Sequence, residues 1–363
     1  MYITRDPPIP TEIGESEERS AVANLKRWAS KGTPRPFYLR LRDIAWSWRL
    51  LLEFVYDLKR FSRYSSAVQS GNTREKLKAL LTMAYHSLEK GLSLKAPKPG
   101  FGQKHARTLM ARLQRYLAHC GTDEHCIVAF NVLHSYAEFN RKNGISLSWL
   151  NRQLEDLRTK LDLTATEVDS GGVKSVTKTK FMEGAKKDLT DFFESRHSVR
   201  QYSPEPVDVC EIEHAVKLAQ KTPSVCNRQS ARVWLINTPL EVQDALALQD
   251  GARGFSEEVG TVLVITSDLA AFQSAGERYQ CWIDGGLFAM SLIYALHSLG
   301  LVTCCLNWSK THEVDVRFKE RFKIPHAESI IMLLSVGHPI DNFRVAHSWR
   351  KPLSEVLRTV PSK

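Results

Sequence analysis

One segment limits the folds open to this chain more than any other. Over residues 282–299 the sequence is apolar on nearly every side of a helix, with Leu287, Phe288, Leu292 and Leu296 among its large side chains. A helix without a polar face has to be buried on several sides in a protein surrounded by water. The sequence therefore predicts a central helix here, with other elements packed around it.

Short apolar runs in the same half of the chain predict a sheet. Four β-branched or aliphatic runs are typical of buried strands, at residues 233–236, 261–266, 302–306 and 330–336. Helical patterns separate most of them, which predicts an α+β fold, a mixed sheet sandwiched by helices. No Gly-x-Gly-x-x-Gly follows a strand, so a dinucleotide-binding Rossmann unit is not indicated.

The N-terminal half has a different pattern. Helical spacings occur at residues 38–64, after a capping Thr73, and at 103–119, 124–143 and 148–160, following a proline-broken arm at 1–36. Residues 164–180 are rich in Thr, Ser, Gly and Lys, which is typical of a linker. We therefore expect an all-helical N-terminal domain (1–163), a linker (164–180) and an α+β domain (181–363) that begins with a helix near Met182.

The charge follows this division. Residues 1–190 carry 32 Lys+Arg against 20 Asp+Glu, or +12, whereas residues 191–363 carry 18 against 20, or −2. A basic face can meet nucleic acid, an anionic membrane or an acidic substrate, or it can simply be solvated. The basic stretch 38–64 with Trp46 and Trp48 could lie on a membrane as a peripheral contact or pack against neighbouring helices.

Cysteine usage and chain ends bear on metal sites and location. The seven cysteines form no Cys-x-x-Cys pair, so no zinc site is expected, and an odd count without a secretory signal fits the cytoplasm. His86 and Glu89 offer two metal ligands where three or four are needed, so we expect a hydrogen-bonded structural pair. No apolar run is long enough to span a membrane. Adjacent Cys304 and Cys305 are expected to be packing residues.

A cluster of arginines points to the chemistry. Arg196 and Arg200 flank Ser198, and guanidinium forks with a hydroxyl suit a phosphate. Downstream come Pro-Ser-Val-Cys-Asn at 223–227, a glycine-opened apolar helix from Asp284, Cys-Cys-Leu-Asn at 304–307, and Trp349-Arg350 near the end. This series resembles the FMN-dependent nitroreductase family over roughly residues 186–360. The first half also resembles the N-terminal extension of nitroreductase-family proteins associated with polysaccharide biosynthesis, through His-x-x-Glu-Lys-Gly-Leu at 86–92 and Pro-Gly-Phe-Gly at 99–102.

The resemblance implies FMN as the cofactor, NADH or NADPH as the reductant, and a set of site residues. Arg196, His197, Ser198 and Arg350 would surround the phosphate, Arg200 would approach N1 and O2 of the ring, and the backbone N–H of Asn307 would donate to N5. The remaining cofactor contacts implied are Pro223, Ser224, Val225, Asn227, Cys305 and Leu306, with the 223–227 loop reaching the flavin across a homodimer interface. Ser348 and Ser256 stand where family members carry other polar residues.

The implied reaction is a ping-pong hydride transfer from NAD(P)H to an electrophilic small molecule, for example a glycan-pathway intermediate. Only about ten residues (267–276) join a strand to the central helix, where many family members insert helices that cover the active site. We therefore expect the N-terminal domain to supply this cover and to set acceptor choice. The alternative is a flavin-binding scaffold or peripheral-membrane protein with little or no reductase activity, and neither reading involves nucleic acid.

Overall fold

The computed structural model describes residues 35–68, 71–163, 171–173, 179, 188–346, 348 and 350–360. By its internal contacts the chain divides into two units: residues 1–63 with 309–326, and residues 64–308 with 327–363. The N-terminal arm, most of the predicted linker and the predicted helix at Met182 lie outside the described residues. The domain boundary at 164–180 therefore stays a prediction.

The second unit is built on one four-stranded sheet. Its strands are β1 (Ala231–Ile236), β2 (Thr261–Asp268), β3 (Val302–Asn307) and β4 (Glu328–Gly337), in the order β1-β2-β4-β3. All three pairings are antiparallel, and a parallel bridge joins Ser198 to Thr303 at the outer edge of β3. β2 is buried along its whole length, as its run of β-branched residues predicts.

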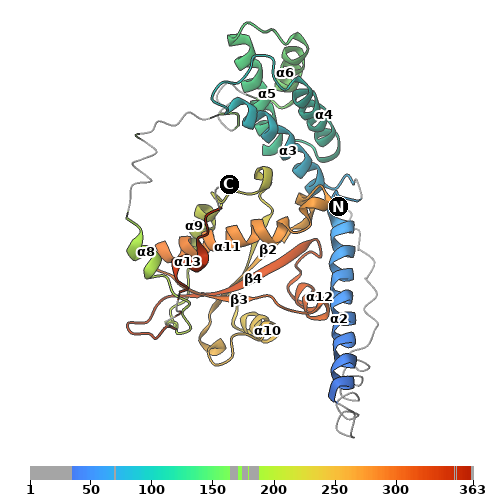
Figure 1. Ribbon diagram of the computed structural model, residues 1–363. Helices are drawn as coiled ribbons and strands as arrows, with labels where there is room; N and C mark the ends of the chain where they lie inside the picture. The colour runs from blue at the N-terminus through green and yellow to red at the C-terminus, as the bar shows by residue number, and fades with distance from the viewer. Residues whose placement is uncertain are drawn as a thin grey trace. The chain divides into compact units, whose positions relative to one another are not determined.

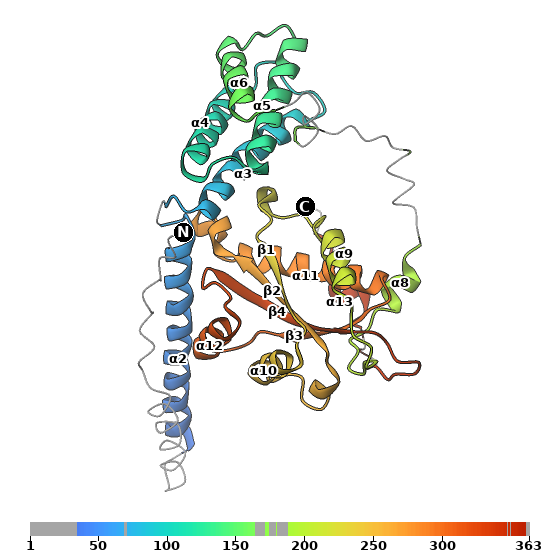
Figure 2. The same cartoon turned by 180° about the vertical axis from the view of Figure 1, so that it is seen from behind.

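Helices cover both faces of this sheet (Figures 1 and 2), with α9 (Val209–Ala219) and α11 (Gln280–Ser298) on one face and α10 (Pro239–Gln249) on the other. The side chain of Asp208 begins α9 through a capping box with Glu211. Phe288, Leu292 and Leu296 of α11 form the core with Leu263 of β2. The α+β fold is thus confirmed.

The prediction that α11 is buried on several sides is wrong for the single chain. One side faces the sheet and α9, but a second stripe is exposed: Trp282 (44%), Ile283 (53%), Leu287 (47%) and Met290 (37%). Spacings of one, four and three residues place these side chains on one side of a helix. The sequence is apolar all round because α11 has two apolar surfaces, and the described part of the chain covers one of them and leaves the other exposed.

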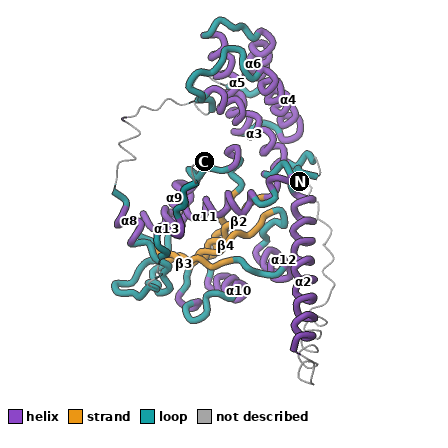
Figure 3. Tube along the Cα trace, viewed as in Figure 1, coloured by secondary structure: helices purple, strands orange, loops and turns teal. Residues whose placement is uncertain are grey.

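Four further helices form a compact cluster in the second unit: α3 (Arg74–Leu92), α4 (Gln103–Cys120), α5 (Glu124–Lys142) and α6 (Ser148–Lys160). Figure 3 shows no strand among them, and they share one apolar core that includes Leu88, Leu113 and Phe130. This confirms an all-helical segment ahead of the sheet. His86 Nδ1 and Glu89 Oε2 lie 4.0 Å apart, which is an ion-pair separation rather than the predicted hydrogen bond. Glu89 instead accepts from the N–H of Gly172 (3.3 Å).

The first unit consists of α2 (Arg35–Tyr64) and α12 (His312–Phe322), and polar side chains join them. Tyr56 O–H donates to Asp315 Oδ2 (2.7 Å), and the fully buried Lys319 Nζ donates to the same oxygen (2.6 Å). Arg60 Nε donates to the carbonyl oxygen of His326 (3.0 Å). Desolvation, with the charge of Arg60, lowers the pKa of Lys319 to about 8 although Asp315 opposes the shift. Among the described residues, no helix is long and apolar enough to cross a bilayer.

Candidate functional site

Residues 196–200, which we call the arginine segment, run along the open edge of β3. Ser198 forms the parallel bridge with Thr303, and Val199 N–H donates to the carbonyl oxygen of Thr303 (3.0 Å). The buried Tyr202 fixes the segment from behind, because its hydroxyl donates to the carbonyl oxygen of Val199 (2.8 Å) and lies 2.7 Å from Ser335 Oγ. The backbone on either side of Arg200 is therefore held rigidly against the sheet.

Arg196 and His197 line a cavity of about 220 Å³ beside this edge. His297, in the last turn of α11, lines the same cavity, with Nε2 3.0 Å from Ser195 Oγ and 3.1 Å from the carbonyl oxygen of Phe192. Desolvation lowers the pKa of His297, the contact with Phe192 opposes this, and the charges of Arg196 and His197 add to it. The lowered pKa favours the neutral form of His297, so Arg196 is the fixed cation at this cavity, and a guanidinium suits an anion. Sequence reasoning missed His297, because a single histidine near a helix end carries no motif.

The amide groups of Cys305 and Asn307 point toward the same open edge. Backbone groups alternate in direction along a strand, and Thr303 already faces the arginine segment, so the residues two and four positions on face that way too. The side chains of Cys305 and Asn307 are exposed, whereas that of Leu306 is buried in the core. Leu306 can therefore contribute only its backbone to a ligand at this edge.

The charges of the two arginines influence the pKa values of the thiols on β3. Desolvation raises the pKa of Cys304 and of Cys305, and a guanidinium opposes the shift in each case, Arg200 for Cys304 and Arg196 for Cys305. Arg196 and Arg200 thus both act on β3. A raised thiol pKa makes these cysteines poor nucleophiles. Cys304 is buried, as expected of a packing residue, whereas the exposed side chain of Cys305 contradicts that expectation.

Gln249 is a second residue that the motifs did not reveal. Its buried side-chain amide donates to the carbonyl oxygen of Asn307 (2.9 Å) and accepts from Gly251 N–H (2.6 Å), so it fixes the end of β3. Ser256, which stands where family members carry another polar residue, accepts a hydrogen bond from Gln243 Nε2 at its carbonyl oxygen (2.8 Å). A buried glutamine at the end of a helix is a weak signal in sequence, since most such residues are exposed.

The loop containing Pro223, Ser224, Val225 and Asn227 lies elsewhere. It includes the short helix η1 (Val225–Asn227) and leads into β1, at the opposite edge of the sheet from β3. Three strand spacings, roughly 14 Å, separate the two edges. Ala231 also lies at the other end of the sheet from Thr303, as the strand register shows. One chain therefore does not bring this loop to the arginine segment.

The same loop lines a cavity of about 880 Å³. Pro223, Ser224 and Asn227 form one part of its wall, and Thr82 and Tyr85 of α3 form another. α3 also packs against η1 and against η3 (Leu269–Ala271). The helical cluster thus covers the region where the short connection 267–276 leaves no room for inserted helices.

Arg350 is among the lining residues of neither the 220 Å³ cavity nor the 880 Å³ cavity. It lies in an exposed stretch, and its Nη1 donates to the carbonyl oxygen of Ser348 (2.6 Å). Ser348 adopts a left-handed backbone (φ 51°). Arg350 is not among the residues that line the cavity of Arg196. Its predicted phosphate contact therefore stays a prediction, and Trp349 lies outside the described residues.

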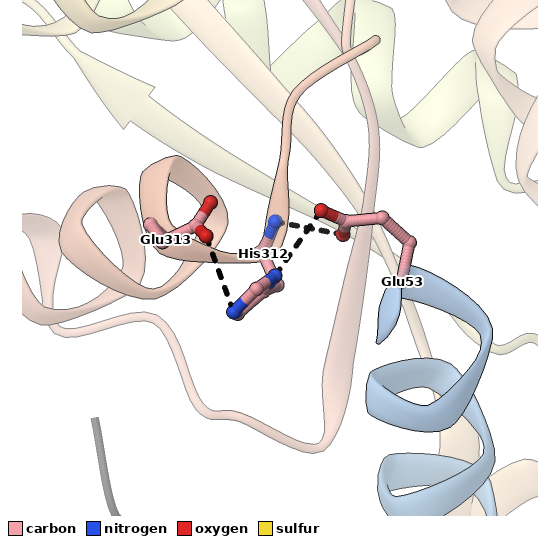
Figure 4. A group of neighbouring side chains, drawn as sticks. All are labelled: Glu53, His312 and Glu313. Atoms are coloured by element: carbon pink, nitrogen blue, oxygen red, sulfur yellow. Dashed lines mark hydrogen bonds and ion pairs between the residues drawn. The ribbon is translucent and has the colours of Figure 1, made fainter. Parts of the chain in front are cut away.

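A third group of titratable side chains occurs in the first unit (Figure 4). Glu53 Oε2 accepts from the backbone N–H of His312 (2.9 Å), and its Oε1 lies 3.1 Å from Nδ1 of the same residue. Nε2 of His312 faces Glu313 Oε1 at 3.4 Å. Each ring nitrogen thus faces a different carboxylate, whereas one metal ion would take one nitrogen. Glu53 acts as a cap on the first turn of α12, and the expectation of no metal site stays a prediction.

Comparison with known proteins finds a family match within the second unit. Residues 193–249 match the sequence model of the nitroreductase family, and this stretch includes the arginine segment and the 223–227 loop. The chain is also similar to an iodotyrosine deiodinase of Nematostella vectensis, with 26% identity over 206 residues, which cover 48% of this chain and 77% of that protein.

Similar solved structures extend over about half of the chain. NfrA1 of B. megaterium has a TM-score of 0.43 and 19% identity, covering 49% of this chain and 76% of that one. A nitroreductase of Desulfovibrio desulfuricans, solved in complex with FMN, has a TM-score of 0.42 and 20% identity, covering 49% and 99%. The resemblance of the helical cluster to extensions of polysaccharide-associated proteins stays a prediction.

Proposed function

We propose that the protein is an FMN-dependent oxidoreductase that takes hydride from NADH or NADPH and passes it to an electrophilic small molecule. The observation that carries this proposal is the pairing of the arginine segment with the edge strand β3, through the Ser198–Thr303 bridge and the hydrogen bond from Val199 N–H to the Thr303 carbonyl oxygen. The family match over residues 193–249 supports it. A flavin needs cations for its phosphate and donors along its ring edge, and Arg196, Arg200 and the backbone of β3 would supply them.

The residues present fit the cofactor in distinct roles. Arg196, His197 and Ser198 would hold the phosphate at the small cavity, with Arg350 as a further cation. Arg200 would place its charge where the reduced ring becomes anionic, and fixed charge at such a position lowers the barrier. The N–H of Asn307 would orient the ring, with Cys305 and the backbone of Leu306 beside it. When bound, FMN would supply the acceptor atom for the hydride and return it to the second substrate in a ping-pong sequence.

A homodimer completes the proposed site. The 223–227 loop lies at the far edge of the sheet in its own chain, so it can meet a flavin on β3 only from a partner subunit. The exposed stripe of α11 provides a surface for such a partner. Gly286 lies within this stripe, and a Cβ there would meet nothing within 4 Å, so another helix could approach closely.

Acceptor choice would belong to the helical cluster. α3 lines the 880 Å³ cavity together with Ser224 and Asn227, and it contributes Glu75, Lys78 and Thr82 to the wall. Thr82→Trp should fill part of this cavity and raise KM for the acceptor, while reduction by NAD(P)H stays unchanged. Equal losses in both half-reactions would contradict this division. A glycan-pathway acceptor and a cytoplasmic location stay predictions.

A peripheral membrane contact is a second proposal, and α2 supports it. The helix carries seven Lys/Arg and three Asp/Glu. Ile44 (67%), Leu51 (49%) and Leu58 (63%) are exposed at seven-residue spacing on the side opposite the polar contacts to α12, near Trp48. Basic amphipathic helices with tryptophan bind anionic lipid surfaces. Flotation with phosphatidylserine vesicles should carry the protein upward, and Trp48→Glu with Leu51→Glu should abolish this.

Anaerobic stopped-flow spectroscopy of the purified protein loaded with FMN tests the main proposal. NADH or NADPH should bleach the flavin absorbance within seconds, and a nitroaromatic or quinone should restore it. A protein that binds FMN but is not reduced by either nucleotide would favour the scaffold alternative. A protein that binds no FMN would contradict both.

A further inference from the structure

The turn at residues 224–229 is held in an unfavourable backbone conformation. Cys226 (φ 50°), Asn227 (φ 53°) and Gln229 (φ 49°) all adopt left-handed values, and none is glycine. Left-handed values are uncommon outside glycine, although asparagine tolerates them better than other residues. Three of them within four residues persist only where the surrounding structure imposes them. Other parts of the chain must therefore hold this turn.

Arg228 is the first anchor. Its side chain is fully buried, and its guanidinium binds Glu277 through two hydrogen bonds (2.6 and 3.1 Å). It also donates to the carbonyl oxygens of Ala271 (2.7 Å) and Val225 (3.1 Å). Burial alone would raise the pKa of Glu277, but hydrogen bonds from Arg228 and Gln273 lower it, so the carboxylate stays charged. A fork that binds four acceptors fixes the turn in both position and direction.

Asp284 is the second anchor. This aspartate of α11 is 3% exposed, and its two oxygens lie 3.2 and 3.4 Å from the N–H of Val225. Gln280 Nε2 donates to it as well (2.8 Å). The turn is therefore tied at Val225 to the central helix and at Arg228 to the connection that precedes that helix.

These anchors leave one polar side chain directed outward. Asn227 is exposed and lines the 880 Å³ cavity, and its side-chain amide makes no hydrogen bond to any described residue. The backbone of the turn is satisfied internally, since Gln229 N–H donates to Ser224 Oγ (2.9 Å) and Asn227 N–H to the Ser224 carbonyl oxygen (2.9 Å). The strained turn, held by these contacts, thus fixes the position of Asn227.

We propose that Arg228, Glu277 and Asp284 are positioning residues that hold the 224–229 turn. The turn then directs the side chain of Asn227 toward a ligand bound by another subunit. This inference rests on the proposed function, in which that ligand is the partner subunit's FMN. It assigns roles to three residues that are not among the implied cofactor contacts, and these roles depend on hydrogen-bond geometry rather than on contact with the flavin.

Four variants separate the parts of the proposal. Arg228→Lys keeps the charge but loses the fork, and Asp284→Asn weakens the tie to Val225. Asn227→Asp tolerates the left-handed backbone but removes the amide donor. The matched control is Asp250→Asn, which breaks the surface pair with Arg253 (2.7 Å) at another left-handed residue. If Arg228→Lys fails to fold, Glu277→Gln tests the same pair.

Two measurements decide the outcome: hydrogen exchange of residues 223–229 in the protein without FMN, and FMN affinity by fluorescence titration. We expect both anchor variants to speed exchange and weaken FMN binding, each by about ten-fold or more. Asn227→Asp should weaken binding with unchanged exchange, and the control should change neither. Thermal destabilisation without loss of FMN affinity would leave the anchors a purely structural role and overturn the proposal. A parent protein that binds no FMN contradicts the proposed function and the role of Asn227, while exchange still decides whether the anchors hold the turn.

Discussion

At the scale of single residues, the proposed phosphate cations stand in different surroundings. Arg196 lines a cavity with His297, whereas Arg350 is exposed and donates to the neighbouring carbonyl oxygen of Ser348. Arg196→Ala should therefore weaken FMN binding by about 1.5–3 kcal/mol, the value of a charge-assisted hydrogen bond, and Arg350→Ala by less. Fluorescence titration measures both, with the exposed Arg253→Ala as control. A larger loss for Arg350→Ala would mean that the C-terminal stretch closes over the cofactor.

Arg200 should act on the flavin's electronics more than on its binding. Its charge reaches Cys304 on β3, and a cation near the ring stabilises the anionic reduced form. Arg200→Gln should keep most of the FMN, lower the two-electron potential and slow reduction by NAD(P)H about ten-fold or more. Spectroelectrochemistry on the flavin-loaded variant gives the potential. An unchanged value would remove Arg200 from the ring edge.

At the scale of elements, α2 is held on α12 by a buried ionic network. Removing one partner of such a network costs about 3–5 kcal/mol, so Lys319→Met should strongly loosen α12, and pairing it with Asp315→Asn should recover most of the loss. Hydrogen exchange in α12 measures this effect. A single variant that exchanges like the parent would show that the network contributes little.

The same network predicts a pH dependence. Lys319 has a pKa of about 8 when folded and 10.5 as its ordinary value, so between these the unfolded state binds more protons. The contribution of Lys319 to stability should therefore increase as the pH rises from about 8 toward 10. It should be lost as the pH falls back through this range, and it should be constant below about 8, where both states are protonated. Denaturant melts should show this slope in the parent and lack it in Lys319→Met. The same slope in both proteins would contradict the assignment.

The exposed stripe of α11 makes a prediction about assembly. Leu287→Asp places a charge in the proposed contact between subunits and should convert dimers to monomers at micromolar concentration, because an unpaired buried charge is costly. Light scattering distinguishes the two states. Leu240→Asp is the control, since Leu240 is an exposed leucine (71%) on α10. A monomeric parent that binds FMN would remove the stripe from this role.

At the scale of the whole molecule, the proposed site takes Arg196 from one chain and Asn227 from the other. Mixing Arg196→Ala subunits with Asn227→Asp subunits should then recover one intact site in each hybrid dimer, about a quarter of all sites after random exchange. FMN-dependent activity of the refolded mixture, compared with each variant alone, measures the recovery. No recovery would mean that both residues serve the same chain's site.

The sequence predicted much of the fold but little of how the site is held. Strands and helices followed from periodicity, and the ends of α4, α5 and α6 differ from prediction by at most one residue. The second apolar side of α11 was misread as burial, since an intersubunit surface and a core surface have the same composition. The roles of Gln249, His297 and Arg228 were missed because they come from partners 43 or more residues away, which no local pattern encodes.

The contact between α2 and α12 has a consequence for how the protein is made. Tyr56 and Asp315 are separated by 259 positions along the chain. At about 5–20 residues per second, a ribosome needs roughly 13–52 s to synthesise the intervening chain. During this interval α2 has left the ribosome with Trp46, Trp48 and Phe54 on its surface while its docking partner does not yet exist. The nascent chain therefore exposes an amphipathic helix with large apolar side chains during most of its synthesis. We expect chaperones to bind α2 in this interval.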